Sequence, residues 1–588
     1  MKSFFKYLFA SILGVLISLF LAFLIMMGIV SAIASSSDKP VSVKDNSILY
    51  IKLDKEIVDR ANDNPFAGFN PGTLQPKTSL GLNKILKALN NAKDDPHIKG
   101  ILMEIDAVNA GAATTEEIRN ALLKFKESGK FIYSYSDTYS QKAYYLASVS
   151  DSVFLNPEGM VEWLGLRSQI MFFKNALDKL GVEPQIIRHG KFKSAVEPFM
   201  LDKMSPANRE QTMTYLSSIW NCWVDGISAS RNISSADLNR MANNMEILNA
   251  KACLNNKLID GLIYKDELID FLKTKLGISD KKDLTVVKLE KYFKAPEVVK
   301  KKFSKDKIAV IYAQGEIGMG EGSDDNIGSD GLSRAIRKAR RDSSVKAIVF
   351  RVNSPGGSAL ASEVIWREVD LAAKVKPVIV SMGDYAASGG YYISAPATEI
   401  IASPTTITGS IGVFGLFFNY GKALDKKLGI NVDVVKTNDH ADFFSSFRSM
   451  TEEERSVGQL LIEGTYQSFI GHVSEGRQIP VERVDEIGQG RVWSGLNAKE
   501  IKLVDNFGGL TDAITLAAQK ANLENYRLIE LPEQKSPVEE LIKEMTGEAR
   551  AALLHNELGD GYKYFNCLKN MMQNQGVQAR LPYNVEVY

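Results

Sequence analysis

The feature that most constrains the fold of this chain is an internal repeat. The segment IKGILMEIDAVNAG begins at Ile98 and VKAIVFRVNSPGGS begins at Val345, an offset of 247 residues (345 − 98). The same offset separates SYSDTYSQKAYYLAS, which begins at Ser134, from SMGDYAASGGYYISA, which begins at Ser381. A constant spacing held over about sixty residues indicates a duplication. The sequence therefore predicts two copies of one fold.

Each copy alternates apolar strands with helices. In the second copy, KIAVIYAQGEI and KAIVFRVNS are typical of buried strands, and GLSRAIRKARRDSSV places its apolar residues at helical spacing. This alternation predicts an α/β fold class. We expect domains at 46–300 and 305–530, joined by the charged stretch KKKFSKDK at 300–307, with a C-terminal extension at 531–588.

The N-terminus predicts a membrane anchor at 1–40. No charged residue occurs from Tyr7 to Ser37, a run long enough to cross a hydrocarbon core of about 30 Å as a helix. The alternative is a cleaved signal peptide, but its apolar region covers only about 7–15 residues. Lys2 and Lys6 precede the run and predict a cytoplasmic N-terminus, which leaves the rest of the chain outside.

Composition narrows the class of function. The formal net charge is +1, so no bulk field favours nucleic acid as a partner. The three cysteines, Cys222, Cys253 and Cys567, match no zinc-ligand spacing, and they would form at most one disulfide in an oxidising compartment. The five histidines are scattered, with no HExxH-like motif. We expect neither a metal nor a cofactor.

A serine stands among small residues in GDYAASGGYY, at 383–392. Two alanines precede Ser388 and Gly389 follows it, so the hydroxyl is uncrowded, as a nucleophile requires. A serine hydroxyl is a poor nucleophile until a base takes its proton, and this stretch contains no base. In the first copy the aligned residues are Gln141 and Lys142, so the fold itself requires neither the serine nor the glycine.

A glycine pair is lost together with the serine. Gly356 and Gly357, in NSPGGS, follow a strand and let backbone N–H groups approach a ligand, where a pair of donors can stabilise an oxyanion. The alternative is a plain strand-to-helix turn. The first copy has Asn109 and Ala110 at these positions. Because one copy lacks both features, we infer a shared chemical role for them in the other.

The base for Ser388 is sought among histidine and lysine. His440, in TNDHADFF, is the one histidine of the second copy in a plausible place, and a loop histidine is usually just solvated. The first copy offers RHGKFKSAVEPF, with Lys191 and Lys193, and a lysine can act as a base when burial lowers its pKa. The residues alone leave the two lysines undecided. Glu197, in the same segment, is expected to be structural.

Four motifs in this order resemble one family. KSAVEPF, VNSPGGS, GDYAASGGYY and TGSIGVFG, behind an N-terminal anchor, resemble signal peptide peptidase A (protease IV) in its long double-domain form. The resemblance covers nearly the whole chain. It implies tandem domains of the Clp protease/crotonase fold, built from repeated β-β-α units, and a Ser/Lys dyad shared between the two domains.

The resemblance also implies a role for each site residue. Ser388 is the expected nucleophile and Lys193, rather than Lys191, the expected general base and acid. Ser410, in TGSIG, is expected to position the lysine amine. The backbone N–H groups of Gly389 and of the Gly356–Gly357 turn are expected to form the oxyanion hole, with the donor between the last two left open.

The implied function is membrane-anchored proteolysis. The family resemblance predicts a homotetramer in the bacterial inner membrane, with its catalytic domains on the periplasmic side, that degrades cleaved signal peptides and similar hydrophobic peptides without a metal or cofactor. Two other hypotheses are an acyl-CoA-processing crotonase-like enzyme and a non-enzymatic membrane scaffold. The last ten residues, ARLPYNVEVY, are expected to belong to a packed extension; the alternatives are a strand or a segment that covers the groove.

Overall fold

The structure is a computed structural model of the 588-residue chain. It describes residues 4, 6–18, 21, 40–62, 69–70, 75–76, 78–299, 302–534 and 576–581. Within these ranges no helix is both long and apolar enough to cross a membrane. Residues 6–18 are helical, and most of the anchor predicted at 1–40 lies outside the described residues.

The first copy is built on a parallel sheet of six strands. In sheet order the strands are β10 (Gly261–Leu262), β8 (Ser152–Val161), β7 (Phe131–Tyr139), β6 (Ile98–Glu104), β1 (Ser47–Ile51) and β11 (Val286–Lys288). Helices on both faces bury such a sheet, so its strands are apolar on both sides. Helix α10 (Lys265–Leu276) covers the outer face with Leu268 and Leu272.

The second copy repeats this sheet. Its strands, in sheet order, are β22 (Val492–Ser494), β20 (Ile407–Gly409), β18 (Val378–Ala387), β16 (Val345–Ser354), β12 (Lys307–Gln314) and β24 (Arg527–Leu531), with β19 (Glu399–Ala402) and β23 (Asn506–Phe507) beyond β18. The predicted offset is visible in the elements, because β7 and β18 begin 247 residues apart (378 − 131). The two copies therefore share their strand order as well as their sequence pattern.

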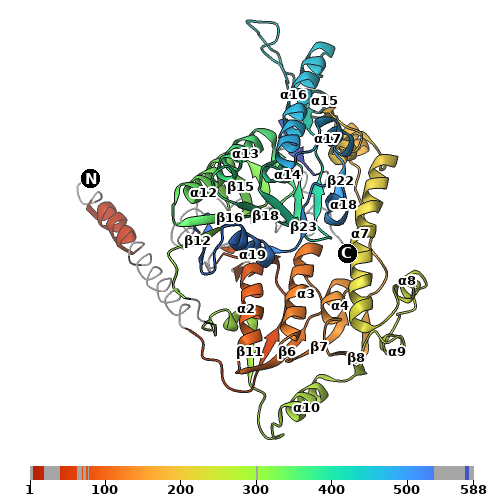
Figure 1. The fold of residues 1–588 in the computed structure, drawn as a ribbon. Helices are drawn as coiled ribbons and strands as arrows, with labels where there is room; N and C mark the ends of the chain where they lie inside the picture. The colour runs from red at the N-terminus through yellow and green to blue at the C-terminus, as the bar shows by residue number, and fades with distance from the viewer. Residues whose placement is uncertain are drawn as a thin grey trace.

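The two copies stack into one body of alternating layers. Figure 1 shows α2 (Leu82–Asp94) and α3 (Ala112–Lys126) between the two sheets. One apolar core joins them, since Leu89 and Leu122 belong to the same cluster as Val310 and Val349 of the second sheet. Helices α12 (Ser329–Arg341) and α13 (Ala359–Ala373) cover the far face of the second sheet. Helices α2 and α3 of the first copy thus form the surface against which the second sheet packs.

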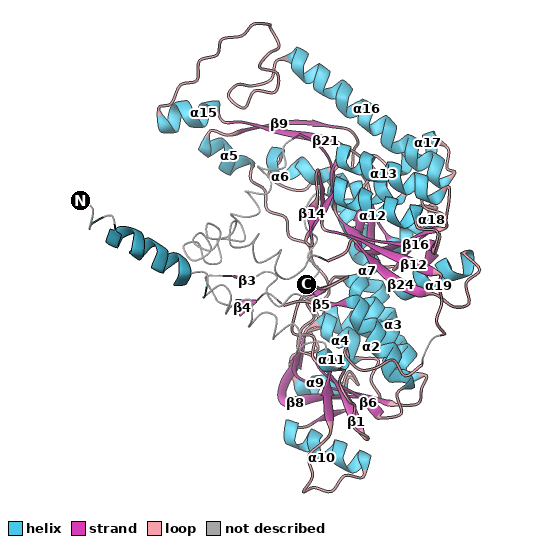
Figure 2. Cartoon of the chain, turned by 90° about the vertical axis from the view of Figure 1, so that its left-hand side faces the viewer, coloured by secondary structure: helices cyan, strands magenta, loops and turns pink. Residues whose placement is uncertain are grey.

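A third sheet crosses the boundary between the copies. Its order is β14 (Gly322–Ser323), β15 (Asn326–Gly328), β13 (Glu316–Gly318), β17 (Gly356–Ser358), β25 (Gly576–Arg580), β21 (Phe414–Asn419) and β9 (Glu183–Arg188). Figure 2 shows β9 and β21 side by side, although they belong to different copies. The chain leaving β9 therefore enters the second copy.

The cysteine prediction is tested in part. Cys222 and Cys253 are free thiols, so they do not form a disulfide with each other. Cys253 is buried and Cys222 partly buried, and burial raises the pKa of both thiols. Cys567 lies outside the described residues.

Candidate active site

Ser388 occupies a sharp turn between a strand and a helix. Strand β18 ends at Ala387 and helix α14 (Gly389–Ser394) begins directly after the serine. The serine has φ 54° and ψ −113°, an unusual conformation for a residue with a side chain. Its N–H donates to the Gly409 carbonyl at 2.8 Å and its side chain is fully buried. Such a turn aims the hydroxyl in one direction.

Lys193 reaches this serine from the other copy. It lies between β9 and the short helix η1 (Ser194–Val196), and its Nζ is 2.8 Å from Ser388 Oγ. The side chain has 0% exposure, and burial lowers the pKa of its amine well below the usual range for lysine. Among the described residues no carboxylate forms an ion pair with it. A neutral amine at this distance is a base for the hydroxyl.

Ser410 completes the contacts of the lysine amine. It follows β20 with φ 50°, and its N–H donates to the Arg491 carbonyl at 2.7 Å. Its Oγ lies 3.0 Å and its carbonyl oxygen 3.2 Å from Lys193 Nζ. With Ser388, these oxygens surround the amine on three sides and orient its lone pair.

The other candidates for the base lie elsewhere. Lys191 is exposed, with its Nζ over the Phe192 ring. His440 is exposed and lies 3.9 Å from Glu453. Glu197 is buried and accepts hydrogen bonds from Ser205 and Asn208 at the start of α7 (Pro206–Arg231), a structural arrangement. Of the four residues considered, Lys193 is the one that contacts Ser388.

Two residues that sequence reasoning missed hold the lysine in place. Gly490 has φ +78°, and a Cβ on it would lie 2.6 Å from Lys193 Cβ. Gln211 of α7 donates to the Phe192 carbonyl and to Ser194 Oγ, on either side of the lysine. Gly490, in GQGRVW, could have been recognised in the sequence as a position where another backbone approaches closely. Nothing in the sequence marks Gln211, a glutamine within a helix, as a residue near the site.

The glycines meet beside the serine. Gly356 has φ +101°, and a Cβ on it would lie 2.7 Å from the Gly389 nitrogen. The Gly356 N–H already donates to Ser354 Oγ at 3.1 Å. Gly357 follows in the same short strand, β17, with φ +159°. The close approach explains why side chains are excluded here, and it leaves the N–H groups of Gly357 and Gly389 as the candidates for oxyanion donors.

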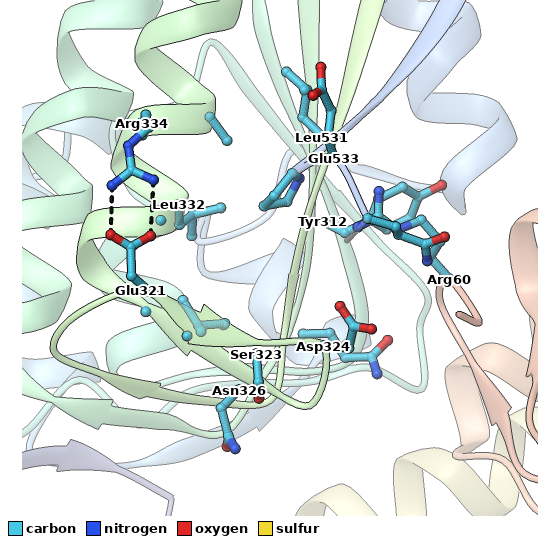
Figure 3. A pocket seen from close by; sticks show the side chains of 18 of the residues that line it. Arg60, Tyr312, Glu321, Ser323, Asp324, Asn326, Leu332, Arg334, Leu531 and Glu533 are labelled. Atoms are coloured by element: carbon cyan, nitrogen blue, oxygen red, sulfur yellow. Dashed lines mark hydrogen bonds and ion pairs between the residues drawn. The ribbon is translucent and has the colours of Figure 1, made fainter. Parts of the chain in front are cut away.

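A separate cavity of about 330 Å³ lies outside this site. Figure 3 shows Arg60 and Tyr312 at one side of it and the Glu321–Arg334 ion pair at the other. None of the predicted site residues lines it. In the described part of the chain, no cluster of three or more histidine, cysteine, aspartate or glutamate side chains could hold a metal ion.

Comparisons with known proteins agree with a duplicated peptidase. A model described as Peptidase family S49 matches residues 124–279 and again 370–524. Protease 4 of Salmonella typhi is 36% identical over 553 residues, which cover 91% of this chain and 88% of that protein. A putative signal peptide peptidase SppA of Enterococcus faecium is 36% identical over 199 residues, covering 33% of this chain and 57% of that protein. A solved ClpP1 mutant from Listeria monocytogenes is 14% identical, with a TM-score of 0.24, and covers 35% of this chain and 94% of its own.

The duplicated α/β fold, the match to the family model and the similarity to Protease 4 define the chain as a serine peptidase. It belongs to peptidase family S49, with one match of the family model in each copy. The prediction of a peptidase is confirmed, and the hypotheses of an acyl-CoA-processing enzyme and of a non-enzymatic scaffold are set aside.

Proposed function

We propose that Ser388 is the nucleophile of this peptidase and Lys193 its general base. The observation that carries the proposal is the 2.8 Å contact between Ser388 Oγ and a fully buried lysine amine. The neutral amine takes the hydroxyl proton while Oγ attacks a peptide carbonyl, and the lysine then gives the proton to the leaving amine. Water hydrolyses the acyl-enzyme with the same lysine as base. Ser410 keeps the amine aimed at Oγ.

The oxyanion of the tetrahedral intermediate is held by Gly389 and Gly357. The Gly389 N–H opens helix α14 directly after the nucleophile. Gly357 is preferred to Gly356 as the second donor because the Gly356 N–H is bonded to Ser354 Oγ. Two preorganised donors at a developing negative charge lower the barrier by several kcal/mol, about 2.7–4 kcal/mol for each one in known cases.

The substrates are remnant signal peptides and similar hydrophobic peptides, cleaved next to the membrane. Supporting this are the name of the Enterococcus faecium relative and the uncharged run from Tyr7 to Ser37, which suits an uncleaved anchor at 1–40. In this proposal the two copies have the Clp protease/crotonase fold, the enzyme is a homotetramer in the bacterial inner membrane, and the catalytic copies face the periplasm.

Three single variants test the dyad. Ser388→Ala removes the nucleophile and Lys193→Ala removes the base, so each is expected to lower kcat for peptide hydrolysis, the latter by about 10²–10⁴-fold. Lys191→Ala is the matched control, since it deletes an exposed amine two residues away, and it is expected to keep wild-type activity. Circular dichroism verifies that each variant is folded.

Labelling gives a second readout for the same proposal. A fluorophosphonate probe is expected to modify Ser388 in the wild type and in Lys191→Ala, but only slowly in Lys193→Ala. Full activity in folded Ser388→Ala or Lys193→Ala would refute the dyad.

A further inference from the structure

A histidine stands where the chain leaves β9 and enters the second copy. His189 is the first residue after β9, and residues 189–193, here called the lysine segment, run from it to the proposed base. Its N–H donates to the Val413 carbonyl at 3.1 Å, beside the last pair of the ladder between β9 and β21. Beyond this hydrogen bond the chain has left the sheet, so its contacts with the second copy set its course.

Two side chains of one helix hold the histidine ring. Helix α16 (Glu452–Arg477) belongs to the second copy and lies next to β9 and β21 (Figure 2). The His189 ring stacks on the ring of Tyr466, with 3.8 Å between centroids and 24° between planes. Its Nδ1 lies 2.7 Å from Glu463 Oε2. Stacking fixes the plane of the ring and the charged partner fixes its rotation within that plane.

The same tyrosine joins the histidine to the chain that closes over the lysine. Its hydroxyl donates to Asp485 Oδ1 of α17 (Val481–Ile487) at 2.6 Å, and it accepts the Gln489 N–H at 3.3 Å. The Gln489 carbonyl in turn accepts the N–H of Phe192, the residue before the lysine, at 2.9 Å. Tyr466 is fully buried, so this chain of contacts is shielded from water. The lysine segment is therefore tied to the second copy at both of its ends.

We propose that His189 is a positioning residue for the peptidase reaction. Held by Glu463 and Tyr466, it fixes the lysine segment on the second copy, so that the Lys193 amine stays within hydrogen-bond reach of Ser388 Oγ. His189 acts through this segment and not by contact with the reacting atoms. The inference rests on the proposed roles of Ser388 and Lys193, and it adds a residue of the first copy and its two partners on α16 to the groups on which the reaction depends.

The lysine amine reports on the position of this segment. Lys193 has 0% exposure, and burial is what lowers the pKa of its amine. A shift of the segment would lengthen the 2.8 Å contact with Ser388 Oγ and let water reach the amine. The pKa of the amine would then rise toward its ordinary value, and the acid limb of kcat/KM, which reports the free base, would move to higher pH. A residue that only stabilises the fold would not move this limb.

The same helix holds a second histidine in the same way. His472 stacks on Trp366 with 3.5 Å between ring centroids, and its Nε2 lies 3.0 Å from Glu363 Oε2. Its side chain is 20% exposed, as is that of His189. Both partners of His472 belong to α13 of the second copy, away from the lysine segment. His472 is therefore a matched control for the loss of a stacked and paired histidine.

The experiment measures kcat and KM of the full-length enzyme on a quenched fluorescent hydrophobic peptide across a range of pH. His189→Ala is expected to lower kcat by at least ~10-fold with little change in KM, because a small displacement of a reacting group is costly. Its acid limb is expected to move to higher pH. His189→Phe keeps a ring on Tyr466 and is expected to recover part of both losses.

Glu463→Ala tests the same contact from the partner side. Its carboxylate is 37% exposed, so the substitution spares the core even if His189→Ala does not fold. We expect a fall in kcat and a shift of the acid limb in the same direction as for His189→Ala. The double variant is expected to lose no more than His189→Ala alone, since both substitutions break one contact.

His472→Ala is expected to lower Tm as His189→Ala does, but to keep the wild-type acid limb and the wild-type rate of fluorophosphonate labelling at Ser388. Equal acid limbs in His189→Ala and His472→Ala would overturn the positioning role. So would wild-type kcat in folded Glu463→Ala and His189→Phe. In each of these cases the dyad stands as long as Lys193→Ala is inactive, whereas an active Lys193→Ala refutes the dyad itself.

Discussion

At the scale of single residues, the proposed site concentrates groups that lower the stability of the fold. Ser388 holds a backbone conformation that costs a residue with a side chain about 1–3 kcal/mol. Lys193 places an amine in a fully buried position without a carboxylate partner among the described residues. Both features suit the proposed chemistry, because the turn aims the hydroxyl and burial favours the neutral form of the amine.

Replacing Lys193 by methionine is therefore expected to stabilise the protein while abolishing activity. Burial lowers the pKa of the folded amine below its unfolded value near 10.4, so the unfolded chain binds more protons between the two pKa values. Wild-type stability then rises with pH in that window by about 1.4 kcal/mol per pH unit, and the methionine variant lacks this dependence.

Urea unfolding at pH 7 and pH 9 measures the effect. The stability advantage of Lys193→Met is expected to be larger at pH 7 and smaller at pH 9. Lys191→Met, at an exposed position, is the control and should show no such change. An advantage that is absent at pH 7, or identical at both pH values, would contradict a neutral buried lysine.

At the scale of elements, the site is formed by short segments that connect strands to the next element, and not by one helix or strand. The turn after β18 carries Ser388, the proposed nucleophile, the turn after β20 carries Ser410, and the segment after β9 carries Lys193. The segment around Gly490 closes over the lysine backbone. Rigid strands hold these turns, and so the positions of their side chains are precise.

Gly490→Ala tests this convergence. The substitution forces a side chain into a left-handed conformation, φ +78°, and directs its Cβ to within 2.6 Å of Lys193 Cβ. We expect a loss of about 1–2 kcal/mol in stability from the backbone conformation, together with a fall in kcat as the amine is displaced. Gly464→Ala, in helix α16 (Glu452–Arg477) with open space around it, should instead be neutral or stabilising. Equal effects of the two substitutions on kcat would argue against the role of Gly490.

At the scale of the whole molecule, buried charges fix the two copies against each other. Arg351 of β16 is fully buried and lies 2.7 Å from carboxylate oxygens of both Asp59 and Glu117, which belong to the first copy. Asp384, four residues before Ser388, accepts hydrogen bonds from the N–H and the hydroxyl of Thr114, at the start of α3. Since serine and lysine come from different copies, the register of this interface decides whether they meet.

Arg351→Met is expected to destabilise the protein by about 3–5 kcal/mol, because it leaves two buried carboxylates without their cation. Hydrolysis is expected to fall with it as the copies lose their register. Arg483→Ala removes an exposed partner of Glu486 and should cost less than about 1 kcal/mol. Urea unfolding measures the loss of stability in both variants. A loss below about 1 kcal/mol for Arg351→Met would refute the role of Arg351 in holding the two copies together.

Much of the architecture could be predicted from the sequence because strand and helix patterns are local. The 247-residue offset is kept by β7 and β18 and by α3 and α13, which begin at Ala112 and Ala359. The end of the chain was less tractable. A packed extension was favoured for the last residues over a strand or a segment covering the groove; Gly576–Arg580 form strand β25, which pairs with β17 and β21. A five-residue strand between partners more than 150 residues away leaves no local signal.

The sequence by itself determined the duplication, the α/β class and the residues that one copy retained and the other lost, since these depend on pattern and spacing along the chain. The residues alone left Lys191 and Lys193 undecided and the resemblance favoured Lys193; the tertiary structure shows the physical difference, with Lys193 buried against Ser388 and Lys191 exposed. It also showed which glycine N–H is already bonded to Ser354. The physical reason is that burial, and with it the pKa of an amine, depends on residues brought together from both copies, here 195 positions apart.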